Sequence, residues 1–253
     1  MKTLRDFGLL FKRSFLQSLR NKAWFGIGVA TPLLYLALFA PLLQKLTGGP
    51  GFTTGNTLDV FLPGILAFLA FNSGTSGGWT TIFELQEGYV ERIRVTPVSR
   101  LALLVGPILS SITYLFIFSA VLVAVAMPFG FHLNFVGMLV TFVLLALMHA
   151  ITASFAVSIA LLTRDMGSMA SVVVGISLPV LLLSGVLLPL TLAPTWERIL
   201  AHINPLYYVV EADRLLAQGN IINGMVGLAF LVMVILTGIT LWWATRVFRK
   251  AVA

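Results

Sequence analysis

The sequence predicts an all-helical protein that crosses a membrane several times. Hydrophobic residues make up 58% of the 253 residues, whereas soluble domains contain about 45–50% apolar residues. The mean hydropathy is +1.00. Charged residues are only 10% of the chain, and most of them lie between long apolar runs. We therefore expect one polytopic membrane domain over residues 1–253, and the absence of cysteine excludes disulfides and thiolate metal sites.

Residues 1–22 are expected to form an amphipathic helix that lies on the membrane surface. They contain six basic residues, and an apolar stripe follows one helical face through Leu4, Phe7, Phe11, Phe15 and Leu19. Leu9 and Leu16 interrupt the polar face, so a plain basic leader remains an alternative. A cleaved signal peptide fits less well, because the basic region is long and no polar, small-residue cleavage site follows it.

Six apolar runs are long enough to cross a bilayer, which takes about 20 residues each. They lie at 23–44, 60–82, 101–128, 134–162, 168–190 and 223–246. If residues 44–59 lie outside, thirteen Lys and Arg residues fall on the inner side and three on the outer side. Basic residues favour the cytoplasmic side of a membrane. Both termini are therefore predicted to lie in the cytoplasm.

Three features in or between the predicted spans have a packing explanation. The small-residue run 73–78 in the second span favours close approach of another helix, and a hinge or a bend that faces substrate is the alternative. His149, in the fourth span, is expected to hydrogen-bond a neighbouring helix, with proton or metal binding as the alternative. The short connection 163–165 ends in Asp165, which is expected to cap the next helix.

A densely charged stretch, residues 84–100, separates the second and third spans. Unpaired charges are costly in lipid, so this stretch is expected to lie outside the bilayer. A helix is predicted to continue from the second span through Arg94, with Glu87 and Glu91 on one face. Pro97 ends this helix, because the residue before a proline disfavours the helical conformation. The stretch is thus predicted to be a short, stiff helix with a sharp stop.

The pattern Glu-x2-Glu-Gly-x2-Glu-Arg-x-Arg-x-Thr-Pro-x-Ser, which runs from Glu84 to Ser99, resembles a known loop. It is the signature loop of the type-two ABC transporter permeases of bacteria, the daunorubicin-resistance and multidrug exporter family. In that family the loop lies between the second and third spans and docks on a separate ATPase subunit. The resemblance implies a coupling helix at 84–98, with the coupling residues Glu84, Glu87, Gly88, Glu91, Arg92, Arg94, Thr96 and Pro97. An ordinary charged cytoplasmic loop remains the alternative.

The stretch 183–222 is too long for a simple loop and too interrupted for a span. Apolar segments of about 10–14 residues with such breaks are typical of re-entrant or interfacial pieces. LSGVLLPLTLAPTW followed by INPLYYVVEADRLL resembles the external region of the same exporter family, where a broken hairpin and a short helix follow the fifth span. The residues of this expected external hairpin are Ser184, Gly185, Pro189, Pro194, Trp196, Asn204, Pro205, Tyr207 and Glu211.

No Gly-x4-Gly-Lys-[Ser/Thr] motif occurs, so the sequence contains no P-loop that would hold ATP phosphates. No nucleophile elbow or zinc-type histidine cluster is visible either, which disfavours a membrane-bound enzyme. A secondary transporter would normally place acidic residues within its spans. The third to fifth spans contain none.

The resemblance implies a permease that binds no cofactor of its own and takes energy from a partner that binds ATP and Mg. The expected partners are two ATPase copies and a second permease copy, as a homodimer with contacts through the first and fifth spans. The expected cargo is a hydrophobic drug, an antibiotic or a lipid-like compound. A lipid-linked polysaccharide or lipo-oligosaccharide is the alternative cargo. The expected location is the cytoplasmic membrane of a bacterium, and no nucleic-acid partner is expected despite the net charge of +7.

Overall fold

The computed structural model describes residues 8, 11–12, 14–16, 26, 28, 30–38, 57–88, 100–131, 134–186, 190 and 193–251. No strand occurs among them. The main helices are α3 (Thr57–Gln86), α5 (Arg100–Ala126), α6 (Phe135–Thr163), α7 (Met166–Leu182), α8 (Thr195–Ala201), α9 (Pro205–Ala217) and α10 (Gly224–Ala251). A 3-10 turn, η1 (Met127–Phe129), follows α5. This architecture confirms the predicted all-helical class.

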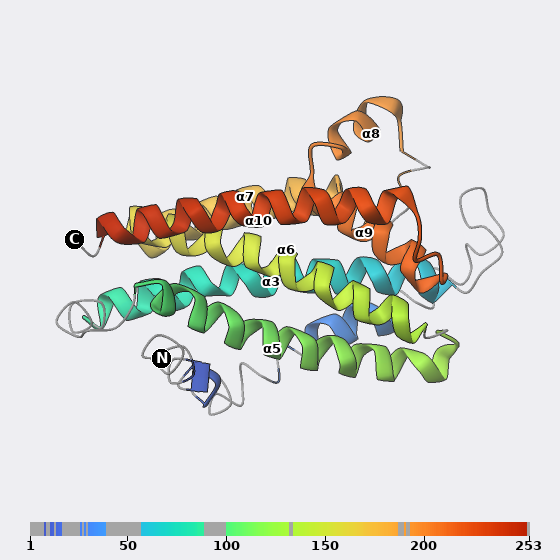
Figure 1. Cartoon of the computed structure of the whole chain (residues 1–253), viewed down its shortest axis with the longest axis horizontal. Helices are drawn as coiled ribbons and strands as arrows, with labels where there is room; N and C mark the ends of the chain where they lie inside the picture. The colour runs from blue at the N-terminus through green and yellow to red at the C-terminus, as the bar shows by residue number, and fades with distance from the viewer. Residues whose placement is uncertain are drawn as a thin grey trace.

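The long helices lie side by side and alternate in direction along one axis (Figure 1). We call one end of this bundle the α9 end, because α8 and α9 lie there. The other end is the Gly88 end, where α3 and α10 finish and α5 begins (Figure 1). The short connections after α5 and after α6 place those neighbouring helices antiparallel. The helix α3 therefore joins the two ends directly.

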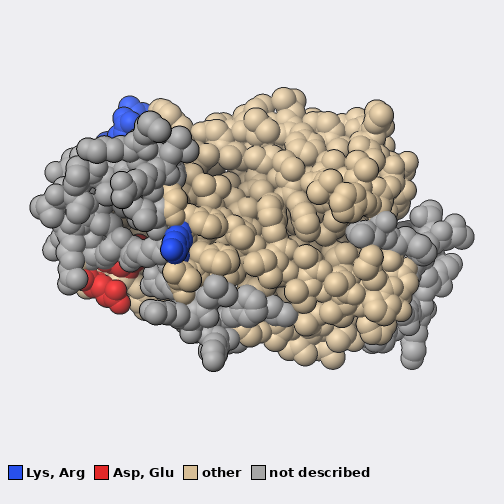
Figure 2. Space-filling model, turned by 60° about the horizontal axis from the view of Figure 1, so that its bottom comes forward, with Lys and Arg blue, Asp and Glu red and all other residues tan. Residues whose placement is uncertain are grey.

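Four described helices are long and apolar enough to cross a membrane: Leu58–Gln86, Val105–Phe129, Phe135–Thr163 and Gly224–Lys250. They contain 25–29 residues, and at about 1.5 Å per residue each exceeds the roughly 30 Å hydrocarbon core. Figure 2 shows a broad uncharged belt across the bundle, with the charged side chains of this view gathered at one end. These helices confirm four of the six predicted spans, and half of the first, 23–44, lies outside the described residues.

The fifth predicted span, 168–190, is shorter than the sequence suggested. The helix α7 has 17 residues and ends at Leu182. Pro179 lies inside its last turn, and the chain then turns at Ser184 and Gly185. Proline removes a backbone donor from a helix, and glycine accepts the left-handed backbone that ends one. The boundary at residue 190 is therefore wrong, while the apolar helix itself is present.

The helices α3 and α6 form the centre of the bundle, and small residues allow them to approach closely. A Cβ atom added at Gly74 would lie 2.8 Å from the carbonyl oxygen of His149. A Cβ atom added at Gly78 would lie 2.8 Å from the carbonyl oxygen of Ala156. Real Cβ atoms do not approach a backbone oxygen so closely, so larger residues would push the helices apart. This contact confirms the packing interpretation of the 73–78 run.

The connection between α6 and α7 is a tight capped turn. Arg164 takes a left-handed conformation with φ of 52°. The Asp165 side chain then accepts a hydrogen bond from the backbone N–H of Ser168 at 2.7 Å, which is a standard helix N-cap. That same bond lowers the pKa of the Asp165 carboxyl. The predicted capping role of Asp165 is confirmed.

Candidate functional site

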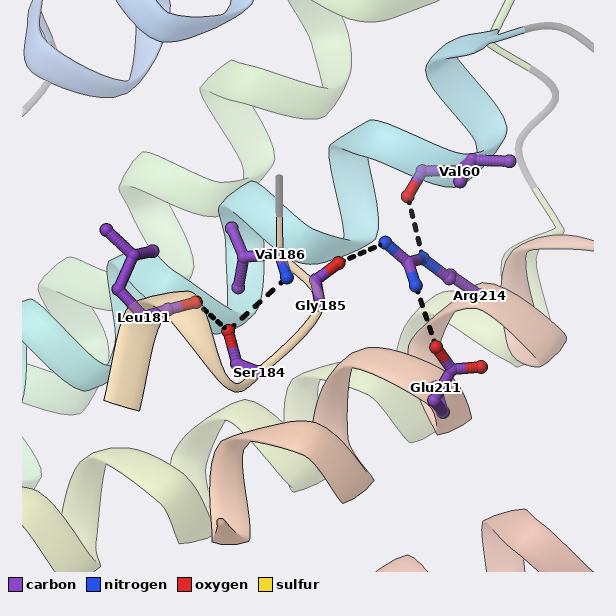
Figure 3. A network of polar contacts seen from close by, with 7 residues as sticks. All are labelled: Val60, Leu181, Ser184, Gly185, Val186, Glu211 and Arg214. Carbon is purple, nitrogen blue, oxygen red and sulfur yellow. Dashed lines mark hydrogen bonds and ion pairs between the residues drawn. The ribbon is translucent and has the colours of Figure 1, made fainter. Parts of the chain in front are cut away.

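Arg214 on α9 holds three separate elements together at the α9 end (Figure 3). Its Nε donates to the carbonyl oxygen of Val60 on α3 at 3.0 Å. Its Nη2 donates to the carbonyl oxygen of Gly185 at 2.6 Å, and its Nη1 donates to Glu211 Oε1 at 2.7 Å. Arg214 is buried, with 6% of its surface exposed. Burial lowers the pKa of its guanidinium, and Glu211 opposes that shift. We call this group of contacts the Arg214 network.

Val60 on α3, whose carbonyl accepts from Arg214, lies close to a proline within the helix. Pro63 sits inside the first turns of α3, and proline has no backbone N–H to complete the helical ladder. Arg214 supplies a donor to the nearby carbonyl of Val60. One turn further, a Cβ atom added at Gly64 would lie 2.6 Å from the carbonyl oxygen of Val186. The start of α3 is thus held by a side chain from α9 and by the backbone of the Ser184–Val186 turn.

The turn after α7 brings the Gly185 carbonyl to this network. Gly185 has a φ of 73°, a backbone angle that residues other than glycine rarely adopt. The Ser184 hydroxyl donates to the carbonyl of Leu181 at 2.6 Å and accepts from the backbone N–H of Val186 at 3.3 Å (Figure 3). These bonds fix the turn, so Ser184 and Gly185 from the expected external hairpin are both brought to one place.

Asn204 and Pro205 begin α9 and attach it to α7. The Asn204 side chain accepts from the backbone N–H of Leu206 at 3.0 Å and caps the helix. Its amide nitrogen donates to the carbonyl of Val180 on α7 at 2.7 Å. Pro205 occupies the first turn of α9, where a missing N–H costs nothing. One side chain therefore begins α9 and joins it to α7.

The remaining residues of the expected hairpin lie on or near α8 and α9. Pro194 precedes α8, and Trp196 on α8 is 63% exposed. The Tyr207 ring lies 5.2 Å from the His202 ring, and burial, with Glu211 nearby, raises the pKa of Tyr207. Pro189 lies outside the described residues. A re-entrant path for this stretch stays a prediction.

At the Gly88 end, the coupling stretch begins differently from the prediction. The helix α3 ends at Gln86, and Gly88 takes a left-handed φ of 67°. The backbone N–H of Gly88 donates to the carbonyl of Leu85 at 3.2 Å, so the chain turns here. The continuous helix through Arg94 is therefore wrong at Gly88, because glycine permits a helix-ending conformation at little cost.

The structure thus separates the coupling residues into two groups. Glu84 lies in the last turn of α3, while Glu87 and Gly88 form the turn that follows. Five further coupling residues lie outside the described part of the chain: Glu91, Arg92, Arg94, Thr96 and Pro97. Their proposed role stays a prediction.

His149 forms a polar node at the centre of the bundle. Its Nδ1 lies 2.9 Å from the Ser73 hydroxyl on α3, and its Nε2 lies 2.6 Å from the Ser111 hydroxyl on α5. The His149 side chain is fully buried. It joins three helices by hydrogen bonds, which confirms the interhelical role that the sequence favoured. No cluster of three potential metal ligands occurs within the described parts of the chain.

Sequence reasoning missed the importance of Arg214 and of its neighbour Asp213. Both are charges in the interrupted stretch 183–222, and Arg214 is one of the three basic residues predicted to lie on the outer side. Glu211 and Arg214 are three apart, which places them on one side of a helix. Asp213 and Arg214 are both buried in the structure. The one signal in the sequence was a pair of opposite charges within a largely apolar segment. The acceptors of Arg214 on α3 and at Gly185 are backbone carbonyls, which the sequence does not reveal.

A bundle of apolar antiparallel helices with a charged turn at one end and a polar network at the other defines a multi-pass helical membrane protein. Residues 5–216 match the family model described as ABC-2 type transporter. The chain belongs to this family. Membership implies a transmembrane subunit of an ABC transporter, which works with an ABC ATPase partner.

Similar proteins bear a consistent name. The chain is 32% identical over 219 residues to "Putative transport permease ycf38" of Cyanophora paradoxa, across 84% of this chain and 74% of that protein. It is 28% identical over 218 residues to the protein of that name from Porphyra purpurea, across 83% and 73%. The protein of that name from Pyropia yezoensis is 27% identical over 232 residues, across 84% and 74%.

Proposed function

We propose that this chain is the permease subunit of an ATP-driven exporter for a hydrophobic drug, an antibiotic or a lipid-like compound. The observation that carries the proposal is the family match over residues 5–216 in a chain whose described helices are long and apolar. The sequence has no P-loop of its own, so a separate ATPase supplies the energy. The cargo leaves the cytoplasm or the inner leaflet of the membrane.

The proposed assembly contains two permease copies and two ATPase copies in the cytoplasmic membrane of a bacterium. Each permease has six spans, both termini in the cytoplasm and the α9 end outside. The distribution of basic residues, thirteen against three, supports this orientation. Four apolar helices and the shorter α7 support the span count. A homodimer would place the transport path between two copies, and a heterodimer with a related permease is an outcome of the same experiment.

The ATPase docks at the Gly88 end in this proposal. The residues 84–98 leave the end of α3 through the turn at Gly88 and carry Glu91 and Arg92 to the ATPase surface. Since α3 reaches from this turn to the Arg214 network, a displacement at the ATPase is transmitted along one helix. Pro97 limits the conformations of the segment.

Reconstitution with the ATPase tests the proposed function. Inside-out vesicles are assayed for ATP-dependent uptake of a hydrophobic dye, a phospholipid analogue and a lipid-linked oligosaccharide. The expected result is uptake of the dye or the lipid that requires both ATP and the ATPase. Uptake of only the lipid-linked oligosaccharide would select the alternative cargo. Uptake driven by an ion gradient without ATP would contradict the proposal.

Cysteine labelling tests the orientation, because the native chain has no cysteine. Pro50→Cys is expected to react with a membrane-impermeant thiol reagent on intact cells, whereas Val90→Cys is expected to react only after the membrane is opened. The reverse pattern would contradict the proposed topology.

A further inference from the structure

Asp213 on α9 is a buried carboxyl without a hydrogen-bond partner among the described residues. It is 1% exposed, and neither carboxylate oxygen makes a hydrogen bond to any described residue. The side chain borders a cavity of about 20 Å³, room for one water molecule. The cavity lies between α9, α3 and α6, and its lining includes Pro63, Phe131, Asn134, Gly137 and Thr141.

The surroundings of Asp213 favour a neutral carboxyl. Arg214 follows it in the chain, but the Arg214 donors are directed to Val60, Gly185 and Glu211. The Thr141 hydroxyl is close enough to favour the carboxylate without reaching hydrogen-bond geometry. An ionised carboxylate with no partner is strongly disfavoured in an apolar site. Burial therefore raises the pKa of Asp213 well above its ordinary value.

A metal ion fits the cavity poorly. Hard cations such as calcium take six or more oxygen ligands, whereas the lining is mostly carbon. The Asn134 side-chain oxygen already accepts a hydrogen bond from the backbone N–H of Gly137 at 2.9 Å. Asp213 and Thr141 are then the oxygen-bearing side chains left for a ligand. A proton removes the charge of the carboxyl, and one water molecule in the cavity can hydrogen-bond to it, so no further ligand is needed.

We propose that Asp213 is a proton-binding site that makes the docking of α9 on α3 and α6 depend on pH. With its proton, the carboxyl is neutral, and α9 lies against the two helices. Loss of the proton places a charge in an apolar cavity, and α9 separates from α6 so that water reaches the carboxylate. The Arg214 network lies next to this site, so the separation also loosens the contact between α9 and the start of α3.

The sign of the pH effect follows from proton linkage. Docked α9 keeps the proton to a higher pH than undocked α9, whose Asp213 titrates near an ordinary pKa of about 4. Between these two pKa values, each pH unit weakens docking about tenfold. Below this window the docking constant does not change with pH, and above it the constant levels off at its lowest value. Docking is therefore strongest in acid and weakens as the pH rises.

Among the described residues, few other titratable groups lie on the elements that border the cavity. On α9 itself they are Glu211, Arg214, Tyr207 and Tyr208, and on α3 the nearest is Asp59 in the first turn. On α6, His149 lies eight residues from Thr141, about 12 Å along the helix. The charged residues of α10 are in its final turns, at the opposite end of the bundle. His132 follows Phe131 in the sequence and lies outside the described residues, so it needs its own control.

Hydrogen exchange of α9 amides in lipid nanodiscs tests the proposal on the full chain. Protection, corrected for intrinsic exchange, is measured from pH 5 to pH 9 for the wild type and for Asp213→Asn. The wild type is expected to lose protection with pH, by up to about tenfold per unit, while Asp213→Asn is expected to show no slope. Glu197→Gln, a carboxylate on α8, and His132→Gln are controls that should keep the wild-type slope.

Two further measurements keep the test decisive if Asp213→Asn folds poorly. Infrared spectra of the wild type at neutral pH are expected to show a protonated carboxyl band. Thr141→Val removes the hydroxyl that favours the charged form of Asp213. The loss of protection should therefore continue to a higher pH than in the wild type. A wild type without a slope, or without the carboxyl band, would overturn the proposal. The same slope in Asp213→Asn, or protection that depends on sodium at constant ionic strength, would also overturn it.

Discussion

The two ends of α3 differ in how tightly the rest of the chain holds them. Near its start, a Cβ atom added at Gly64 would lie 2.6 Å from the carbonyl oxygen of Val186, and Arg214 donates to Val60 at 3.0 Å. Just beyond its other end, a Cβ atom added at Gly88 would meet no atom of a described residue within 4 Å. The α9 end is fixed by contacts within the chain. No described residue crowds the turn at Gly88.

This difference matches two separate tasks for one helix. Buried, directional hydrogen bonds specify one position of α3 at the α9 end, because leaving such groups unpaired costs more than an ordinary hydrogen bond contributes. A turn that no described residue crowds can accept a docked protein without breaking contacts with those residues. Substitutions at the α9 end should therefore reduce stability, whereas substitutions in the stretch after Gly88 should change the response to a partner.

The largest effect is expected from Arg214→Met. The change leaves Glu211 and the carbonyls of Val60 and Gly185 without their donor. Removing one partner of a buried ion pair costs about 3–5 kcal/mol, and the partial exposure of Glu211 favours the lower value. Denaturant unfolding in detergent micelles measures the loss of stability.

The matched control is Arg198→Met on α8. Arg198 is exposed and donates to the carbonyl of Ala193 at 2.9 Å, five residues away on its own segment. Its loss is expected to cost less than about 1 kcal/mol. Equal losses in the two variants would remove the distinction between the Arg214 network and an ordinary surface arginine.

An intermediate effect is expected from Gly64→Ala. The new methyl group collides with the backbone of Val186 rather than with a flexible side chain, and overpacking of this kind costs about 1–3 kcal/mol. Gly238→Ala on α10 is the control, since a Cβ atom there meets no described residue within 4 Å. Alanine in a helix is favoured over glycine by about 0.5–1 kcal/mol, so the control should be neutral or more stable. Thermal unfolding in one detergent compares the pair.

Much of this organisation follows from the sequence. Apolar length predicted four of the spans, and the small-residue run that contains Gly74 and Gly78 predicted the close approach of another helix, which the structure identifies as α6. The turn at Gly88 was missed because a charged pattern with helical spacing outweighed one glycine. The Arg214 network was missed because its acceptors are backbone carbonyls, which any residue supplies. Local patterns therefore predicted the helices, while the partners of buried charges required the tertiary structure.

The smallest effect is expected at the His149 node, midway between the two ends. A double-mutant cycle with His149→Leu and Ser111→Ala isolates their shared hydrogen bond. Hydrogen bonds between helices in membranes contribute about 0.6 kcal/mol on average and at most about 1.7. A second cycle pairs His149→Leu with Ser177→Ala, whose hydroxyl bonds within α7. This cycle should give no coupling energy. A coupling of equal size in both cycles would contradict a specific role for the node.

The most direct test of the account compares charge reversals after Gly88 with Arg214→Met in vesicles that also contain the ATPase. Glu91→Lys and Arg92→Glu are expected to leave insertion and unfolding unchanged, but to lower substrate-stimulated ATP hydrolysis and transport at least about tenfold. A tenfold change takes about 1.4 kcal/mol, less than the cost of one broken desolvated ion pair. Arg214→Met, by contrast, is expected to act mainly by lowering the free energy of unfolding. Unchanged hydrolysis and transport in both charge reversals would contradict the claim that this stretch couples the permease to its ATPase.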